Sequence, residues 1–169
     1  MIAQSLLMFL LPALLATAAA FDLASFTIPN RLSLALVLAF GLFALAAHFS
    51  LAVFLLHLLA GFIALVLGFA LFTRGYIGGG DAKFFAAVAL WLGLHDLLAF
   101  TLVASLLGGL LTLALLSLRQ LPLPANLARL GWILKLHEES SGIPYGVALA
   151  AGALVILPHA EILKLAASV

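Results

Sequence analysis

Long apolar runs, separated by short polar turns, most strongly limit how this chain can fold. The longest runs cover residues 2–20, 51–72 and 97–118. Each is close to the about 20 residues that a helix needs to cross the hydrocarbon layer of a membrane. Only 8% of the residues are charged, whereas soluble domains average about 25%. A soluble fold of this length could not bury so much apolar surface, so the sequence predicts an integral membrane protein in contact with a lipid bilayer.

The predicted fold is all-α, with one transmembrane domain over residues 1–169 that contains a bundle of about six helices. Three further spans are expected at residues 32–47, 82–94 and 144–158. Asn30 is expected to cap the helix that follows it. A polar insertion at about 119–143 contains apolar residues at roughly helical spacing. This pattern favours a short helix on the membrane surface, and a plain linker is the alternative.

The basic residues predict the orientation of the bundle. With six spans, all but one of them fall in the turns at one face, namely Arg31, Arg74, Lys83, Arg119, Arg129 and Lys135, and only Lys164 falls at the other. Lys and Arg collect on the cytoplasmic side of membrane proteins. We therefore expect both termini to be extracytoplasmic.

Several classes of site find no support in the sequence. No basic patch with interleaved aromatic residues is present, so no nucleic acid partner is expected. The absence of cysteine excludes disulfides, thiolate catalysis and cysteine-ligated zinc. The five histidines are scattered without ligand spacing. We predict neither a metal nor a cofactor.

The first apolar run has an alternative interpretation as a cleaved signal peptide, because small residues near Ala20 resemble a cleavage site. A signal peptide begins with a basic segment, but the first basic residue here is Arg31. The sequence therefore favours a membrane span over residues 2–20.

The segment Gly78-Gly79-Gly80-Asp81-Ala82-Lys83 presents a carboxylate on a nearly bare backbone between two apolar runs. An ionisable residue at a membrane span is a candidate functional residue. Glycines at 78–80 would let an extended substrate backbone approach Asp81. In the alternative interpretation the segment is only a turn in which Asp81 caps a helix. Lys83 is expected to be an interfacial anchor, although its charge could also favour an ionised Asp81.

Asp22 is the expected partner of Asp81. Asp22 ends the first span and Asp81 begins the fourth, so two intervening crossings place them at the same face, whereas Asp96 falls at the opposite one. Two carboxyl groups held close together share a proton. The ionised member can take a proton from water, and the protonated member can polarise a peptide carbonyl. The pair is therefore predicted to catalyse peptide hydrolysis in the manner of an aspartic protease.

These residues resemble the motifs of a known family. Gly78-x-Gly80-Asp81-x-Lys83 resembles the GxGD motif of the type IV prepilin peptidases and the archaeal preflagellin peptidases. Presenilin-type proteases also carry this motif. Asp22 followed by Ile28-Pro29-Asn30 resembles the region of the first aspartate in that family. Pro144-Tyr145-Gly146 resembles the opening of its last helix. The three features occur in the family's order and extend over nearly the whole chain.

The resemblance implies a membrane aspartyl endopeptidase with Asp22 and Asp81 as catalytic residues and Gly78, Gly80 and Lys83 as supporting residues. Its partners would be prepilins, from which it would remove a short basic leader at the cytoplasmic face of the inner membrane. The large prepilin peptidases have an extra cytoplasmic domain, often with paired cysteines, and many also N-methylate the product. This chain instead resembles the compact peptidases of Tad/Flp pilus systems, so the expectation of N-methylation does not carry over.

Two other classes of function remain open at the level of the sequence. The aspartates could relay protons in a small proton-coupled transporter, or they could be a structural pair in a membrane subunit without enzymatic activity. A proton relay would need further acidic residues across the bilayer beyond Asp22 and Asp81, and the sequence has none there, which disfavours this function. Cleavage of a pilin precursor would distinguish the peptidase from both alternatives.

Overall fold

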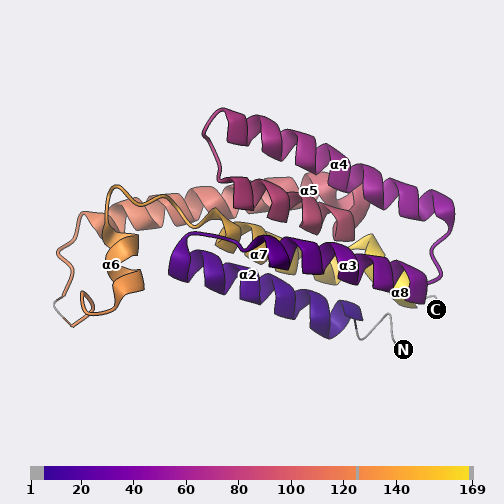
Figure 1. Ribbon diagram of the computed structural model, residues 1–169, viewed down its shortest axis with the longest axis horizontal. Coiled ribbons are helices and arrows are strands. Elements are labelled where there is room, and N and C mark those ends of the chain that lie inside the picture. The colour runs from indigo at the N-terminus through magenta and orange to yellow at the C-terminus, as the bar shows by residue number, and fades with distance from the viewer. Residues whose placement is uncertain (1–5, 125, 168–169) are drawn as a thin grey trace.

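The computed structural model describes residues 6–124 and 126–167, and within these ranges all the regular structure is helical, which confirms the predicted all-α class. Figure 1 shows the arrangement. In chain order the elements are the π-helical turn η1 (Leu6–Leu10), α2 (Leu11–Ser25), α3 (Asn30–Ala46), α4 (Leu51–Thr73), α5 (Gly79–Arg119), α6 (Gly131–His137), α7 (Tyr145–Ile156), the 3₁₀ turn η2 (Leu157–His159) and α8 (Glu161–Ala167). Residues 2–5 of the first predicted span lie outside the described residues.

The helices are long and apolar enough for a membrane protein. In the described part of the chain, three reach the length and hydropathy of a membrane span, namely Leu7–Ser25, Leu51–Thr73 and Gly79–Arg119. Two shorter apolar helical segments, Asn30–Ala46 and Tyr145–His159, lie among them.

The helix α5 is bent back on itself at Gly93. This residue has φ 76° and ψ 178°, outside the helical region. The rings of Phe85 and Phe100 stack with their centroids 5.5 Å apart, although 15 residues of straight helix would separate them by about 22 Å. The chain therefore forms a first limb, 79–92, and a second limb, 94–119, that run side by side (Figure 1). The reversal lies two residues before the turn expected at His95.

The connections between the helices lie at two opposite ends of the bundle. Figure 1 shows the α2–α3 and α4–α5 connections at one end, together with the insertion that carries α6. The α3–α4 connection and α8 lie at the other end. The last turn of α2 and the first turn of α5 therefore lie at the same end.

Small residues bring the helices close together. On α4 the buried positions Ala60, Ala64 and Gly68 recur every four residues, and a Cβ added at Gly68 would lie 3.1 Å from the backbone of Ala82 on α5. Such spacing is typical of helix contacts in membranes, where close approach provides van der Waals contact. It holds the start of α5 directly against α4.

An aromatic cluster fills the centre of the bundle. The indole of Trp91 is fully buried and donates a hydrogen bond to the carbonyl of Leu36, with 2.9 Å between N and O. Phe40 and Phe43 pack against it. A Trp in an apolar core needs such a partner for its N–H, so this bond fixes α3 against the first limb of α5.

Two local expectations require correction, and one helix was not predicted. Asn30 does not cap α3, since the helix begins without a side-chain cap and the Asn30 amide oxygen instead accepts a hydrogen bond from Lys83. The helix in the insertion is confined to Gly131–His137, so the apolar residues before it lie in turns. The short helix α8 was not expected from the sequence.

Substituting Gly93 by alanine tests the reversal. Its φ and ψ lie in a region that is nearly exclusive to glycine, and an added Cβ would lie 2.9 Å from the buried ring of His57. We expect Gly93→Ala to lower the unfolding temperature in detergent by about 3–10 °C. Gly109→Ala is the matched control, because no atom lies within 4 Å of its added Cβ. Equal unfolding temperatures for Gly93→Ala and the wild type would contradict the described reversal.

Candidate active site

Asp22 lies in the last turn of α2, with its side chain buried. The residue is 4% exposed. Helix α2 ends because Phe26 adopts a left-handed conformation, with φ 58°, and donates its N–H to the carbonyl of Asp22, with 2.7 Å between N and O. Pro29 then restricts the backbone before α3. The turn therefore holds the Asp22 carboxylate inside the bundle.

Asp81 lies in the first turn of α5. One of its carboxylate oxygens accepts the N–H of Gly78, the residue that precedes the helix, with 3.2 Å between N and O. A Cβ on Gly78 would lie 3.0 Å from the same oxygen, so glycine leaves room for the carboxylate. Gly80 packs on the backbone of Ile28, where a Cβ would make only ordinary contact. Asp81 therefore does cap the start of α5, as one interpretation of the sequence suggested, and this hydrogen bond positions its carboxylate.

The two carboxyl groups meet at the start of α7. The N–H of Gly146 donates to Oδ2 of Asp22, with 2.6 Å between N and O. Asp81 interacts electrostatically with Asp22 and with the same N–H. Residues 22, 81 and 146 are far apart in the chain, and the ends of α2, α5 and α7 bring them together.

A cavity of about 400 Å³ opens beside Asp81. Its walls are mainly apolar and come from α4, both limbs of α5 and α7, with Asp81, Arg74, Thr101, Ser105 and Tyr145 as the polar lining residues. Asp22 is not among the lining residues. Asp81 is thus the member of the pair that faces a space large enough for part of a peptide.

The comparison with protein families identifies the chain. The model of the type IV leader peptidase family matches residues 9–113, which include Asp22 and Asp81. The chain belongs to this family. Comparisons with curated proteins and with solved structures gave no significant match.

The membership confirms the resemblance to prepilin peptidases that the motifs indicated. It supports a peptidase that acts on leader sequences. The matched range ends within the second limb of α5 and does not include Gly146, whose contact with Asp22 is seen only in the structure.

Lys83 contacts Asn30 and has no ion pair with Asp81 in the described part of the chain. Its ammonium group donates to the amide oxygen of Asn30, with 3.0 Å between N and O. This bond joins the start of α3 to the first turn of α5. In this leader peptidase family member, Lys83 therefore links α3 to α5, and its hydrogen bond goes to Asn30 instead of to Asp81.

The polar insertion is attached to the same end of the bundle. Lys135 of α6 donates to the carbonyl of Ser25, with 3.1 Å between N and O, and lies 5.0 Å from the centre of the Phe26 ring. Arg119 donates to the carbonyls of Leu136, Ser141 and Gly142. The insertion is therefore fixed to the last turn of α2, three residues from Asp22.

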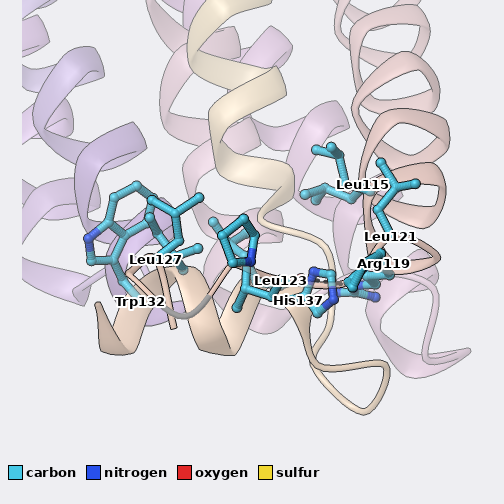
Figure 2. Close-up of a pocket in the computed structure, with 12 residues that line it drawn as sticks. Leu115, Arg119, Leu121, Leu123, Leu127, Trp132 and His137 are labelled. Carbon is cyan, nitrogen blue, oxygen red and sulfur yellow. Dashed lines mark hydrogen bonds between the residues drawn. The ribbon is translucent and has the colours of Figure 1, made fainter. Parts of the chain in front are cut away.

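A second cavity, of about 460 Å³, lies between the insertion and the end of α5. Figure 2 shows its lining, with Arg119 and His137 together at one side and Leu127 and Trp132 at the other. None of the candidate active-site residues predicted from the sequence lines this second cavity. The Arg119 guanidinium is already bonded to backbone carbonyls, so this cavity offers little chemistry.

The opposite end of the bundle has its own polar contacts. Asp96 accepts the N–H of Glu161, with 2.8 Å between N and O, and contacts the ring of His95 at 2.9 Å. These bonds anchor the start of α8. Among the described residues no group of His, Asp and Glu is arranged to hold a metal ion.

Sequence reasoning did not assign Gly146, Tyr145 or Arg74 to the site. The Pro144-Tyr145-Gly146 opening was noted as a family feature without a role. A glycine in the first turn of an apolar helix was the available signal, since N–H groups there have no partner within the helix.

Proposed function

We propose that this chain is an aspartic endopeptidase that removes the short basic leader from type IV or Flp-type prepilins at the cytoplasmic face of the inner membrane. Asp22 and Asp81 would be its catalytic residues. The observation that carries this proposal is the convergence of the two carboxyl groups on the Gly146 N–H, beside a cavity, in a member of the leader peptidase family.

The chemistry needs no group beyond the two carboxyls and a water molecule. The ionised carboxylate takes a proton from the water while the water oxygen bonds to the scissile carbonyl carbon. The protonated carboxyl gives its proton to the carbonyl oxygen. The C–N bond then breaks, and the amine leaves with a proton returned by the pair. The apolar surroundings strengthen these interactions because they exclude bulk water.

The proposed topology has six crossings, formed by η1 with α2, α3, α4, the two limbs of α5, and α7. The Asp22 and Asp81 end carries nearly all the Lys and Arg residues, so the distribution of basic residues favours the cytoplasm for it. Both termini would then be extracytoplasmic. The first limb of α5 has 14 residues and spans about 21 Å, less than the about 30 Å of hydrocarbon. Asp81 would thus lie below the membrane surface, where the hydrophobic segment of a prepilin could reach it.

Co-expression with a Flp-type prepilin tests the proposed function. We expect the wild type to produce mature pilin, and Asp22→Asn and Asp81→Asn each to reduce processing by at least about 100-fold, since each removes a member of the proton-sharing pair. Immunoblotting of precursor and product gives the rates.

Asp96→Asn is the matched control, because Asp96 is buried like Asp22 but lies at the other end of the bundle. Normal processing by either Asn variant at 22 or 81 would contradict the assignment. Proton flux in liposomes without any cleavage would instead favour a transporter.

The insertion is proposed to hold the substrate next to the carboxylates. Lys135→Met keeps an apolar stem but loses the bond to Ser25 and the contact with the Phe26 ring. We expect KM for the prepilin to rise about five-fold, corresponding to about 1 kcal/mol of lost positioning, with kcat within two-fold. Lys164→Met on α8 is the control. An unchanged KM in Lys135→Met would contradict a role of the insertion in substrate binding.

A further inference from the structure

The backbone N–H of Gly146 contacts the candidate site from a helix that contributes no acidic side chain. Gly146 is the second residue of α7, where N–H groups lack a partner within the helix and carry a partial positive charge. This N–H is satisfied by Oδ2 of Asp22 over 2.6 Å, and the N–H of the next residue, Val147, also lies near the Asp22 carboxylate.

We propose that Gly146 is a positioning residue that assigns the two roles within the carboxylate pair. Its N–H holds Asp22 as the ionised member, which accepts the proton of the attacking water. Asp81 then carries the proton that is given to the substrate carbonyl. This proposal rests on the peptidase function proposed above and deepens it.

The contacts of the two carboxyl groups are unequal. Asp22 receives the short bond from Gly146 and also lies near the N–H of Val147. Asp81 receives a bond of 3.2 Å from Gly78 and interacts with the Gly146 N–H, but the direct hydrogen bond of that N–H is to Asp22. Hydrogen bonds from N–H groups stabilise a carboxylate and are stronger when the acceptor is ionised. Two neighbouring carboxyls do not both ionise easily, so the negative charge belongs on Asp22.

The nearby cations do not reverse this assignment. Lys83 is bonded to Asn30 and Lys135 to the carbonyl of Ser25. Arg74 lines the cavity beside Asp81, together with Tyr145. In the described part of the chain neither carboxyl has an ion pair with Lys or Arg, so backbone N–H groups provide the contacts that distinguish them.

The position of Asp81 suits the role of the carboxyl that donates a proton to the substrate carbonyl. Asp81 lines the cavity and Asp22 does not, so a peptide carbonyl that enters the cavity meets Asp81 first. The attacking water would lie between the carbonyl and the more deeply buried Asp22.

Glycine at 146 is needed for this contact. An added Cβ would lie 2.8 Å from Oδ2 of Asp22 and 2.5 Å from Cδ1 of Ile28. Any side chain at this position therefore pushes the Asp22 carboxylate away from the N–H. The effect on Ile28 can be separated from the effect on Asp22, because valine at 28 lacks the Cδ1 atom.

The first test compares kcat and KM for prepilin cleavage by purified enzymes. We expect Gly146→Ala to lower kcat about 100-fold with KM within three-fold, and Ile28→Val/Gly146→Ala to remain equally slow. Gly152→Ala is the matched control, since its Cβ would lie 3.0 Å from Ala104, away from the carboxylates. It should reduce stability but keep the kcat of the folded enzyme. Recovery of kcat in the double variant, or full kcat in Gly146→Ala, would overturn the proposal.

The second test removes only the hydrogen-bond donor. An ester in place of the amide between Tyr145 and Gly146, introduced by cell-free synthesis with glycolic acid, lacks the N–H and adds no atom. We expect the acid limb of the pH profile of kcat to move about one unit to higher pH, because the ionised form of the pair loses a bond. An unchanged profile would overturn the proposal.

The wild type is measured in both tests. Absence of wild-type cleavage would contradict the peptidase function and this proposal with it. Wild-type cleavage together with an unaffected Gly146→Ala variant would overturn this proposal alone.

Discussion

The placement of two carboxyl groups in an apolar bundle, Asp22 buried and Asp81 half-buried, is the constraint on which the rest of the structure depends. An isolated carboxylate in such surroundings is strongly disfavoured unless it has hydrogen-bond partners. Here the partners are backbone N–H groups at the beginnings of α5 and α7, from Gly78 and Gly146. Side chains of Lys or Arg would neutralise the pair, whereas N–H groups stabilise it and leave it able to exchange a proton.

The small residues of the chain serve this arrangement. Gly68 allows α4 to lie against the first turn of α5, and Gly93 lets α5 turn back so that its second limb forms a wall of the cavity. The cavity and the carboxylate pair thus result from the same close helix contacts. Bulkier residues at these positions would prevent such close contacts between the helices.

The sequence predicted the features that depend on composition and on local pattern. The all-helical class followed from the apolar runs, and the placement of Asp22 and Asp81 at one end followed from counting the crossings between them. The contact between the Gly146 N–H and Asp22 could not be predicted in this way, because a backbone donor has no signature in the side-chain sequence. The expected cap at Asn30 failed because α3 already begins at this residue, and its amide oxygen accepts a hydrogen bond from Lys83, which is distant in sequence.

Cross-linking of the two aspartate positions tests the central contact most directly. The chain has no cysteine, so Asp22→Cys/Asp81→Cys introduces the only two thiols. A short methylene-bridged bis(methanethiosulfonate) reagent should join them within one chain, which mass spectrometry of the intact protein detects. Asp22→Cys/Asp96→Cys should react only as two separate thiols, since residues 81–92 of the first limb span about 17 Å and Asp96 follows the reversal at their far end. Failure of the 22–81 pair to cross-link, with both thiols reactive, would contradict the account.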